Sequence, residues 1–382
     1  MNEEFFTRGV ERIYPTVEEF KKRLVAGQIK IYFGIDPTGP TLHLGHATVL
    51  LKLRELQDAG HEIIILYGTF TAQIGDPSGK LSARKGLTLA EVNENLKKYK
   101  KQIGKILDLK KTVFKRNDAW LGKLKLGEIL NIASEFTVSQ MLERDMFVER
   151  QKNEQPIFLN EFFYPLLQGY DSVAMGVDAE IGANDQTFNM LTGRTMMSKR
   201  GKEKFVFATK LLVDATGKKM GKTEGNMVTF EDSPNDVYGK VMSWPDGLLA
   251  LGFEICTRLL DGEFKNLIST SPRDAKMRLA KEITKLFHGE AKANKAEKNF
   301  VKVFQTKELP TEIKEVTALK GSLLADVLLE QKLIDSKTAF KNLVEAGAIT
   351  INGEIKITDQ WFKVGETNIF RVGKKKFLKV LV

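Results

Sequence analysis

Hydrophobic and polar positions in the first part of the chain switch between strand and helix periods. Residues 29–36 (IKIYFGID) alternate and are rich in β-forming side chains, whereas residues 44–59 space their leucines as a helix does, before Gly60. Residues 62–70 (EIIILYGTF) are continuously apolar, as in a strand buried on both faces. A strand, a helix and a buried strand in succession predict a βαβ unit, and therefore a parallel sheet covered by helices.

The same alternation continues to about residue 226. Thr88 and Glu91 form a capping-box pattern that predicts a helix running to about Leu107, and residues 205–213 predict a further strand. We therefore expect an α/β domain over residues 1–226.

Two further regions follow, each with its own pattern. Residues 233–304 lack strand patterning, and residues 275–287 place their apolar side chains on one helical face, so residues 227–320 are predicted to be a helical domain with a connector at 302–320. Residues 321–382 predict a small α+β domain. In it we expect helices at 323–331 and 337–345, a hairpin in 348–357 turning at Asn352-Gly353, and a last strand at 369–382.

Composition excludes several classes of protein. Of the 382 residues, 42% are hydrophobic and 28% charged, which is ordinary for a globular chain. No apolar stretch reaches the roughly 18 residues that a membrane helix needs, and residues 1–15 do not resemble a secretory or organellar leader, so we expect a cytoplasmic protein. One cysteine and four histidines offer neither a disulfide nor a structural zinc site, and no metal site is predicted.

Basic residues are concentrated in patches. The chain carries 59 Lys and Arg against 49 Asp and Glu, a formal net charge of +10. Residues 97–116 hold nine basic residues and one acidic residue, residues 194–222 hold nine and two, and the last twelve residues are basic without an acid. Each patch alone is most simply a solvated face, but several in one chain favour an RNA or nucleotide partner.

The turn between the first strand and its helix contains the first candidate site. His43 and His46 are three residues apart at a helix start, where both rings can lie beside the positive end of the helix dipole. This position suits phosphate, and Gly45 permits close packing there. Metal ligation or partial burial in the core explains two histidines at this spacing equally well. The absence of GxGxxG excludes the dinucleotide-binding version of this turn.

A basic loop at residues 217–223 (GKKMGKT) is the second candidate site. The spacing between its glycines is one residue too short for a P-loop, and the loop follows the last strand of the domain instead of the first. We therefore reject the interpretation as a P-loop. Two lysines three residues apart can still stabilise charge that develops on a phosphate, although a lone basic loop is more often only solvated.

Together these two motifs resemble the signatures of class I aminoacyl-tRNA synthetases. Residues 43–46 (HLGH) are similar to the His-x-Gly-His signature and residues 219–223 (KMGKT) to the Lys-Met-Ser-Lys-Ser loop. The closer resemblance is to the bacterial-type tyrosyl-tRNA synthetase family, and it rests on four further segments: residues 32–38 (YFGIDPT), 75–80 (GDPSGK), 164–171 (YPLLQGYD) and 185–186 (DQ). It covers nearly the whole chain. It implies a Rossmann-like catalytic domain, a helical anticodon-binding domain and a small C-terminal RNA-binding domain.

The resemblance also implies roles for individual residues. The catalytic residues that bind the phosphates would be His43, His46, Thr38, Lys219, Lys222 and Thr223. Tyrosine would be bound by Tyr32, Asp76, Tyr164, Gln168, Asp171 and Gln186. ATP would be bound by Gly34, Asp36, Gly45, Asp185, Lys80 and Arg84. Of these, Tyr32 and Asp171 would read the substrate hydroxyl, because a buried hydroxyl must meet a donor or an acceptor.

The implied reaction is activation of L-tyrosine by ATP, with Mg²⁺ on the pyrophosphate, followed by transfer of the tyrosyl group to tRNA(Tyr). No general base is required, since the attacking carboxylate is already ionised at neutral pH. Two alternatives are a catalytically silent RNA-binding paralogue and a tryptophanyl-tRNA synthetase relative. The first is disfavoured by the presence of two histidines and two lysines that would bind the phosphates: His43, His46, Lys219 and Lys222. The pair of hydroxyl readers argues against the second.

The resemblance further implies a homodimer that binds RNA, not DNA or membranes. Pairing would use an insertion at about residues 124–163. Apolar side chains there explain either a dimer contact or an ordinary core: Met141, Leu142, Met146, Phe147, Phe158, Phe162 and Phe163.

Overall fold

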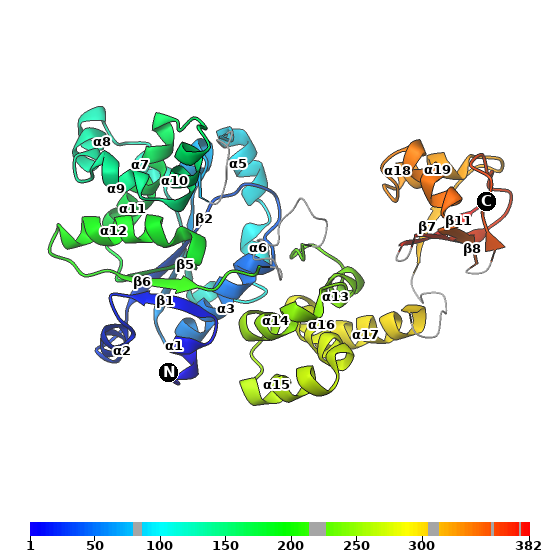
Figure 1. Ribbon diagram of the computed structural model, residues 1–382, viewed down its shortest axis with the longest axis horizontal. Helices are drawn as coiled ribbons and strands as arrows, with labels where there is room; N and C mark the ends of the chain where they lie inside the picture. The colour runs from blue at the N-terminus through cyan, green and yellow to red at the C-terminus, as the bar shows by residue number, and fades with distance from the viewer. Residues whose placement is uncertain (79–85, 214–226, 305–312, 353–354, 374–375) are drawn as a thin grey trace. The chain divides into compact units, whose positions relative to one another are not determined.

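The computed structural model forms two compact units, Met1–Ala293 and Asn294–Val382, which are described separately (Figure 1). It describes residues 1–78, 86–213, 227–304, 313–352, 355–373 and 376–382. Within these ranges, no helix is long and apolar enough to cross a membrane. The three-domain boundaries expected from the sequence are finer than this division and stay a prediction.

A six-stranded sheet organises the first unit. Its order is β1-β6-β5-β2-β3-β4; β1 is antiparallel to β6, and all the other pairs are parallel. The strands are β1 (Val10–Tyr14), β2 (Lys30–Ile35), β3 (Glu62–Tyr67), β4 (Thr112–Arg116), β5 (Ala179–Ala183) and β6 (Phe205–Thr209). The predicted parallel α/β sheet is confirmed, and the four central residues of β3 are buried, as its continuous apolar run requires.

Two crossover helices cover opposite faces of this sheet. Helix α3 (Leu44–Asp58) connects β2 to β3, and helix α12 (Thr187–Ser198) connects β5 to β6. The two crossovers run in opposite directions from the middle of the sheet, so right-handed connections place their helices on opposite faces. Helix α11 (Phe163–Met175) packs along α12 (Figure 1). The chain therefore reverses its direction of winding between β2 and β5.

Shorter helices surround this framework. Their bounds are α1 (Glu4–Thr7), α2 (Val17–Val25), α4 (Thr71–Ile74), α5 (Leu89–Leu96), α6 (Tyr99–Ile103), α7 (Asp118–Leu121), α8 (Leu126–Ala133), α9 (Val138–Leu142) and α10 (Asp145–Lys152), with 3₁₀ turns at Leu109–Lys111, Leu159–Phe162 and Asn184–Gln186. The predicted capping box at Thr88 and Glu91 is present. The expected single helix to Leu107 is wrong, because the chain breaks between α5 and α6 at Lys97-Lys98. The strand expected at 205–213 ends at Thr209.

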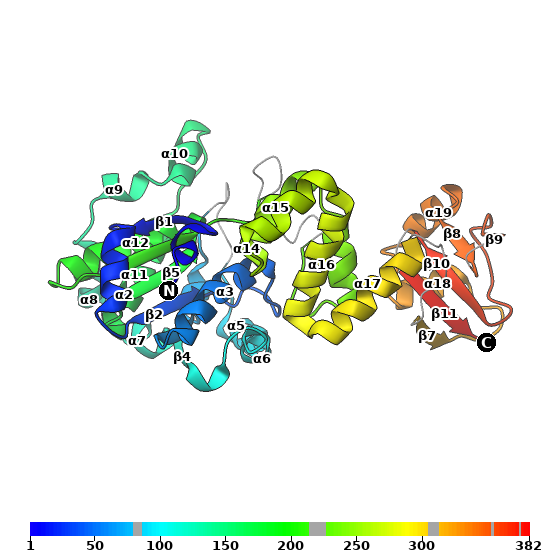
Figure 2. The same cartoon turned by 90° about the horizontal axis from the view of Figure 1, so that it is seen from below.

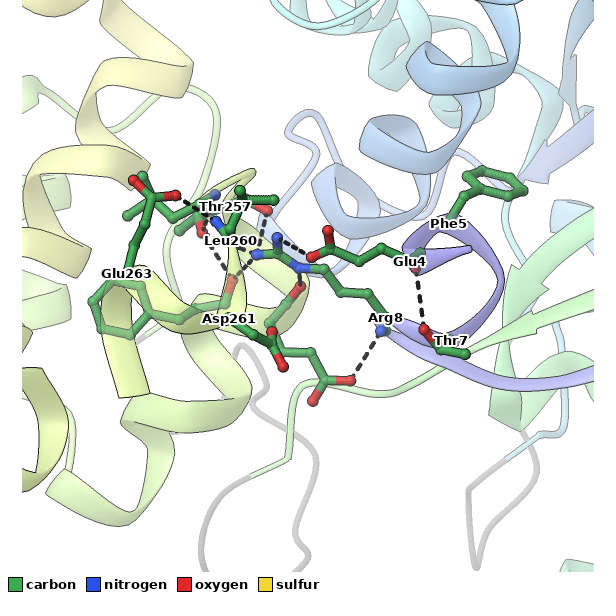
Figure 3. A network of polar contacts seen from close by, with 12 residues as sticks. Glu4, Phe5, Thr7, Arg8, Thr257, Leu260, Asp261 and Glu263 are labelled. Carbon is green, nitrogen blue, oxygen red and sulfur yellow. Dashed lines mark hydrogen bonds and ion pairs between the residues drawn. The ribbon is translucent and has the colours of Figure 1, made fainter. Parts of the chain in front are cut away.

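The last part of the first unit is helical, as the absence of strand patterning predicts. Its helices are α13 (Pro234–Met242), α14 (Leu249–Cys256), α15 (Asp261–Thr270) and α16 (Pro272–His288). Arg8 joins α14 to the N-terminal segment (Figure 3). Its guanidinium donates to the carbonyl oxygens of Phe253 (2.8 Å), Glu254 (2.9 Å) and Thr257 (3.1 Å), so it caps the negative end of α14. The Glu254 side chain in turn accepts from the Gly9 N–H at 2.9 Å.

A cavity of about 280 Å³ lies at this junction. It is lined by residues of α1, α3 and α14, among them Arg8, Lys52 and Glu254. The described candidate site residues lie elsewhere, so this cavity is separate from the site considered below.

The second unit contains a five-stranded sheet in the order β7-β11-β10-β8-β9, with two helices beside it (Figure 2). Its elements are β7 (Lys314–Thr317), α18 (Leu324–Glu330), α19 (Lys337–Glu345), β8 (Ile349–Ile351), β9 (Ile355–Lys356), β10 (Asn368–Val372) and β11 (Lys376–Leu381); helix α17 (Glu290–Phe304) leads into it. The two predicted short helices are confirmed.

Two sequence expectations for this unit are wrong. The single last strand is a hairpin of β10 and β11, for which Gly373 supplies a positive φ of 67° after β10. The expected connector contains β7, which pairs with β11 in parallel. Neither pairing is visible in local periodicity, because both depend on partners elsewhere in the chain.

Candidate active site

The predicted site residues gather where the parallel strands end. Asp36 follows β2, and Asp185 and Gln186 follow β5; Asn117, which was not predicted, follows β4. Since β2 and β5 are neighbours whose connections leave in opposite directions, their carboxyl ends mark the usual ligand site of such sheets.

A cluster of buried polar side chains contains the two expected hydroxyl readers. Tyr32 is fully buried on β2, and its phenol oxygen lies 2.9 Å from the Ser172 hydroxyl. Asp171 is 2% exposed on α11; it accepts from the Trp120 indole N–H at 2.7 Å and from the Asn117 amide at 3.2 Å. Asp171 is therefore a buried carboxyl group with hydrogen-bond partners inside the protein, and not an acid on the helix surface.

The environment of Asp171 shifts its proton affinity. Burial raises the pKa of the Asp171 carboxyl well above its ordinary value, while the hydrogen bonds from Trp120 and Asn117 act in the opposite direction. Burial also raises the pKa of Tyr32, and the nearby Glu180 adds to that shift. A hydroxyl entering this cluster meets groups that lack water and must be hydrogen-bonded by protein or ligand.

Asp36 forms the centre of a second cluster. Its carboxylate accepts from the Thr71 hydroxyl at 2.7 Å and from the Tyr164 hydroxyl at 2.9 Å. A Cβ at Gly68 would lie 1.8 Å from the Asp36 carboxylate, so only glycine fits at the end of β3. Burial, followed by Asp36 and Asp76, raises the pKa of Tyr164, which remains a neutral phenol.

Asp76 and Gln186 contact each other directly. The side-chain amide of Gln186 donates to the Asp76 carboxylate at 2.7 Å. The side-chain amide of Asn189 donates to the side-chain carbonyl of Gln186 at 3.0 Å. Asp76 also accepts from the Ser78 N–H at 2.9 Å, which orders the Asp-Pro-Ser turn. The structure therefore brings two predicted tyrosine-binding residues together.

Gln168, another predicted tyrosine-binding residue, reaches a buried ion pair. Its amide donates to the Glu180 carboxylate at 3.0 Å, and Glu180 also contacts the ammonium group of Lys204. Both Glu180 and Lys204 are buried, with Lys204 fully enclosed.

The two histidines stand at the N-terminus of α3, as predicted. Their ring centroids are 4.0 Å apart, and the His46 Nδ1 accepts from the His43 backbone N–H at 3.2 Å. This hydrogen bond holds the His46 ring against the backbone of the same turn. A Cβ at Gly45 would lie 3.1 Å from the His43 ring, so the glycine makes room for that imidazole.

Side chains of α5 and α6 hold the loop from β2 to α3 by hydrogen bonds. Tyr99 donates to the carbonyl of Gly39 at 2.7 Å, Asn95 donates to that of Pro37 at 2.8 Å, and Gln102 accepts from the Leu42 N–H at 2.7 Å. This loop contains Thr38 and follows Gly34, two further predicted site residues. Gly34 faces solvent, which leaves the backbone there accessible to a ligand.

The remaining predicted residues lie outside the described ranges: Lys80, Arg84, Lys219, Lys222 and Thr223. The chain that follows the second motif is described, and it pairs with the first motif. Leu44 donates its N–H to the Val228 carbonyl at 2.9 Å, and Phe230 donates to that of Leu42 at 3.0 Å. Residues 228–230 are therefore linked by backbone hydrogen bonds to the start of α3.

Several residues of this site were missed by the sequence reasoning. Nothing in the spacing of Asn117, Trp120, Ser172 and Glu180 along the sequence marks them as residues of a site. Arg144 is also missed; it is 5% exposed on the N-terminal side of α10 and donates to the Ser78 hydroxyl at 2.6 Å. Among the described residues, no group of three or more His, Cys, Asp and Glu could hold a metal ion.

Comparison with known proteins decides the family. Residues 25–305 match the family described as tRNA synthetases class I (W and Y). The chain belongs to this family. The tyrosine–tRNA ligase of Thermotoga maritima is 45% identical over 93% of this chain and 90% of its own length, and that of Carboxydothermus hydrogenoformans is 43% identical over 99% and 97%.

Solved structures agree at the level of the fold. A truncated mitochondrial tyrosyl-tRNA synthetase from Coccidioides posadasii aligns with a TM-score of 0.63 at 23% identity, covering 77% of this chain and 90% of its own. The Archaeoglobus fulgidus tyrosyl-tRNA synthetase complexed with L-tyrosine aligns with a TM-score of 0.61 at 24% identity, covering 77% and 98%. The α/β fold of this class I synthetase is therefore confirmed.

Proposed function

We propose that this class I synthetase activates L-tyrosine with ATP and transfers the tyrosyl group to the 3′ end of tRNA(Tyr). Tyrosine–tRNA ligases that match it over nearly their whole length support this function. The observation in the structure that carries it is the cluster of buried polar side chains, where Tyr32 and Asp171 are enclosed together with Trp120 and Asn117. A phenylalanine ring has no hydrogen-bonding group to place there, and a tryptophan ring has only an N–H donor, whereas a phenol hydroxyl both donates and accepts.

The substrate ammonium would be bound by Asp76, Tyr164 and Gln168. These residues supply a carboxylate, a phenol oxygen and an amide carbonyl, all of which accept hydrogen bonds from a cation. Gln186, bonded to Asp76, lies at the end of β5 and is suited to contact the reacting carboxylate. The tyrosine carboxylate itself attacks the α-phosphate, so no residue needs to remove a proton.

ATP would lie across the carboxyl ends of β2 and β5. Gly34, Asp36, Gly45 and Asp185 would bind its nucleoside part, and the start of α3 its phosphates. His43, His46 and Thr38, together with Lys219, Lys222 and Thr223, would hold the phosphates more tightly as charge accumulates in the transition state. Lys80 and Arg84 would assist them. Mg²⁺ would be held by the phosphate oxygens, which it prefers as ligands.

The charge assignment can be tested at Lys222. We expect Lys222→Ala to slow adenylate formation sharply and to leave tyrosine affinity nearly unchanged, because the lysine would contact only phosphate. Pre-steady-state formation of the adenylate, measured beside equilibrium binding of tyrosine, checks this. Unaltered activation kinetics would contradict the assignment.

The proposed assembly is a cytoplasmic homodimer that binds RNA. Five large apolar side chains are exposed between residues 124 and 163: Leu126, Leu130, Val138, Phe158 and Leu159. Three of the contacts expected from the sequence, Met141, Met146 and Phe147, are buried within their own chain and are not available for a partner. The helical region and the second unit would bind the tRNA, mainly through phosphate contacts.

Amino-acid-dependent ATP–pyrophosphate exchange tests the function directly. Tyrosine, phenylalanine and tryptophan would be supplied in parallel, and we expect exchange with tyrosine alone. Exchange with tryptophan would overturn the pocket assignment. Exchange with none of them, in folded protein that binds RNA, would favour a silent RNA-binding paralogue.

A further inference from the structure

A buried ion pair that has no part in the proposed function lies beside Gln168 and Tyr32. Lys204, just before β6, is fully buried, and its ammonium contacts the Glu180 carboxylate on β5 and the Met190 carbonyl on α12, the latter at 3.0 Å. Isolated buried charges are costly, and replacing such a pair with neutral side chains is often neutral for stability. Its presence beside a binding pocket therefore calls for a functional reason.

Two glycines make space for this pair. A Cβ at Gly193 of α12 would lie 2.6 Å from the Lys204 ammonium nitrogen and 2.9 Å from the Ser172 hydroxyl. A Cβ at Gly169 of α11 would lie 3.0 Å from the Gly193 backbone nitrogen. Glycine weakens a helix, so two facing glycines within α11 and α12 indicate that the close approach of these helices and the enclosed ammonium group are required together.

The pair contacts the pocket through Gln168. Glu180 uses one carboxylate oxygen for Lys204 and the other for the Gln168 amide, at 3.0 Å. A carboxylate can only accept, so the NH₂ of Gln168 must face Glu180 and the amide carbonyl must face the other way. The Lys204 ammonium also lies 5.7 Å from the centre of the Tyr32 ring, behind the expected phenol site.

We propose that Glu180 and Lys204 are positioning residues for the substrate ammonium: Lys204 fixes the Glu180 carboxylate, and Glu180 fixes the Gln168 amide so that its carbonyl oxygen accepts from the ammonium group. This inference rests on the proposed role of Gln168 in tyrosine binding. Neither Glu180 nor Lys204 needs to touch the substrate.

The decisive variant is Glu180→Gln. The Lys204 ammonium can only donate, so it would bind the carbonyl oxygen of the new amide at position 180. The NH₂ group of that amide would then face Gln168. The Gln168 amide would then have to turn and present its own NH₂ to the substrate ammonium. We expect tyrosine to bind about tenfold more weakly, the usual effect of losing a hydrogen bond to a charged group. The analogue 3-(4-hydroxyphenyl)propanoate, which lacks the ammonium, should bind as it does to the parent.

A second variant separates orientation from simple loss of the ion pair. In the double variant Glu180→Gln/Lys204→Met the amide at position 180 is no longer forced to face a lysine, and its carbonyl can again accept from Gln168. We expect tyrosine affinity to recover in part. A matched control is Glu161→Gln, which breaks the buried Arg150–Glu161 pair (2.7 Å) elsewhere in this unit and should not change the preference for tyrosine over the analogue.

Equilibrium dialysis of both ligands against the full chain measures these effects. An ammonium-specific loss in Glu180→Gln with recovery in the double variant supports the proposal. Equal weakening of both ligands, an unchanged tyrosine affinity, or no recovery overturns it. Gln168→Ala tests the underlying role separately: if this variant shows no ammonium-specific loss, the role of Gln168 in the proposed function fails, and the inference fails with it.

Discussion

At the scale of single residues, the proposed specificity would depend on buried groups that are hydrogen-bonded to one another in the structure. Asp171 is held by Trp120 and Asn117, and Tyr32 by Ser172. In the proposed function these side chains would offer oriented partners to a substrate hydroxyl, and a substrate without a hydroxyl would forgo those hydrogen bonds. The enzyme family to which this chain belongs is a standard illustration of this type of discrimination.

Replacing the Asp171 carboxylate with an amide tests this arrangement. We expect Asp171→Asn to lower kcat/KM for tyrosine activation by about 10- to 100-fold, because an amide cannot accept from Trp120, Asn117 and a substrate hydroxyl together. Activation of phenylalanine should change less. ATP–pyrophosphate exchange with both amino acids measures the two effects, and Asp58→Asn, at an exposed pair with Arg54, is the matched control. Equal losses for both amino acids would contradict the assignment.

The sequence predicted some of these residues and not others, for a physical reason. His43 and His46 were predicted because they lie in one short segment, residues 43–46, that resembles a family signature as a whole. Trp120 and Glu180 become functional only through partners 51 and 24 residues away, with which they form hydrogen bonds in the folded chain. Motifs report local geometry, and a partner contributed by a distant strand leaves no local signal.

At the scale of elements, the ends of helices and strands place the chemistry. Local periodicity predicted β2 and α3 within one residue at each end, and it predicted the start of β3 but placed its end three residues too late. It failed where an element is held by a distant neighbour, as in β7, or where a helix is broken between α5 and α6. The N-terminal segment also depends on a partner far away in the sequence, because Arg8 caps a helix that begins some 240 residues later.

Removing the Arg8 cap should destabilise the first unit. Arg8→Met keeps the length of the side chain but leaves the carbonyl groups at the end of α14 without their donors. We expect the free energy of unfolding to fall by about 1.5–3 kcal/mol, the usual range for hydrogen bonds to a charged group. Urea denaturation measures this, with Arg12→Met, an exposed arginine on β1, as the control. Similar losses in both variants would contradict the role of Arg8 as a cap.

The exposed apolar side chains of α8 make a prediction about assembly. Leu130 is 58% exposed beside Leu126, which is 72% exposed. If this surface pairs two copies, Leu130→Glu buries a charge in the interface and should shift the protein toward the monomer. Light scattering coupled to size-exclusion chromatography measures the mass. Val25→Glu introduces the same charge at a residue that is 89% exposed on α2 and should leave the mass unchanged. A Leu130→Glu protein of unaltered mass would exclude this surface.

At the scale of the whole molecule, the site exists only because the sheet brings distant segments together. Tyr32, Asn117, Asp171 and Gln186 come from separate strands and helices, and the order β6-β5-β2-β3-β4 places them at one edge. Composition and periodicity predicted that a parallel sheet would form. They could not predict the strand order, because that order depends on which distant pairs of strands bury the most apolar surface together.

The stability of the first unit should fall as the pH decreases through the histidine range. Burial, followed by the positive charge of Lys105, lowers the pKa of His288 below its ordinary 6.5; burial, followed by Arg23, lowers that of His61. Both rings stay neutral in the folded chain at a pH where the unfolded chain binds protons. Protons therefore favour the unfolded state, and the stability that is fully present above about pH 6.5 is lost progressively below it.

Urea unfolding measured at about pH 7.5 and about pH 5.5, on either side of the ordinary histidine pKa, tests this dependence. The parent should unfold at a lower urea concentration at the lower pH. In His61→Gln and His288→Gln the difference between the two midpoints should shrink, and in the double variant it should shrink further, because each substitution removes one group that binds a proton only after unfolding. A double variant with the full difference of the parent would assign the pH dependence to other groups, and would mean that both imidazoles titrate alike in the folded and the unfolded chain.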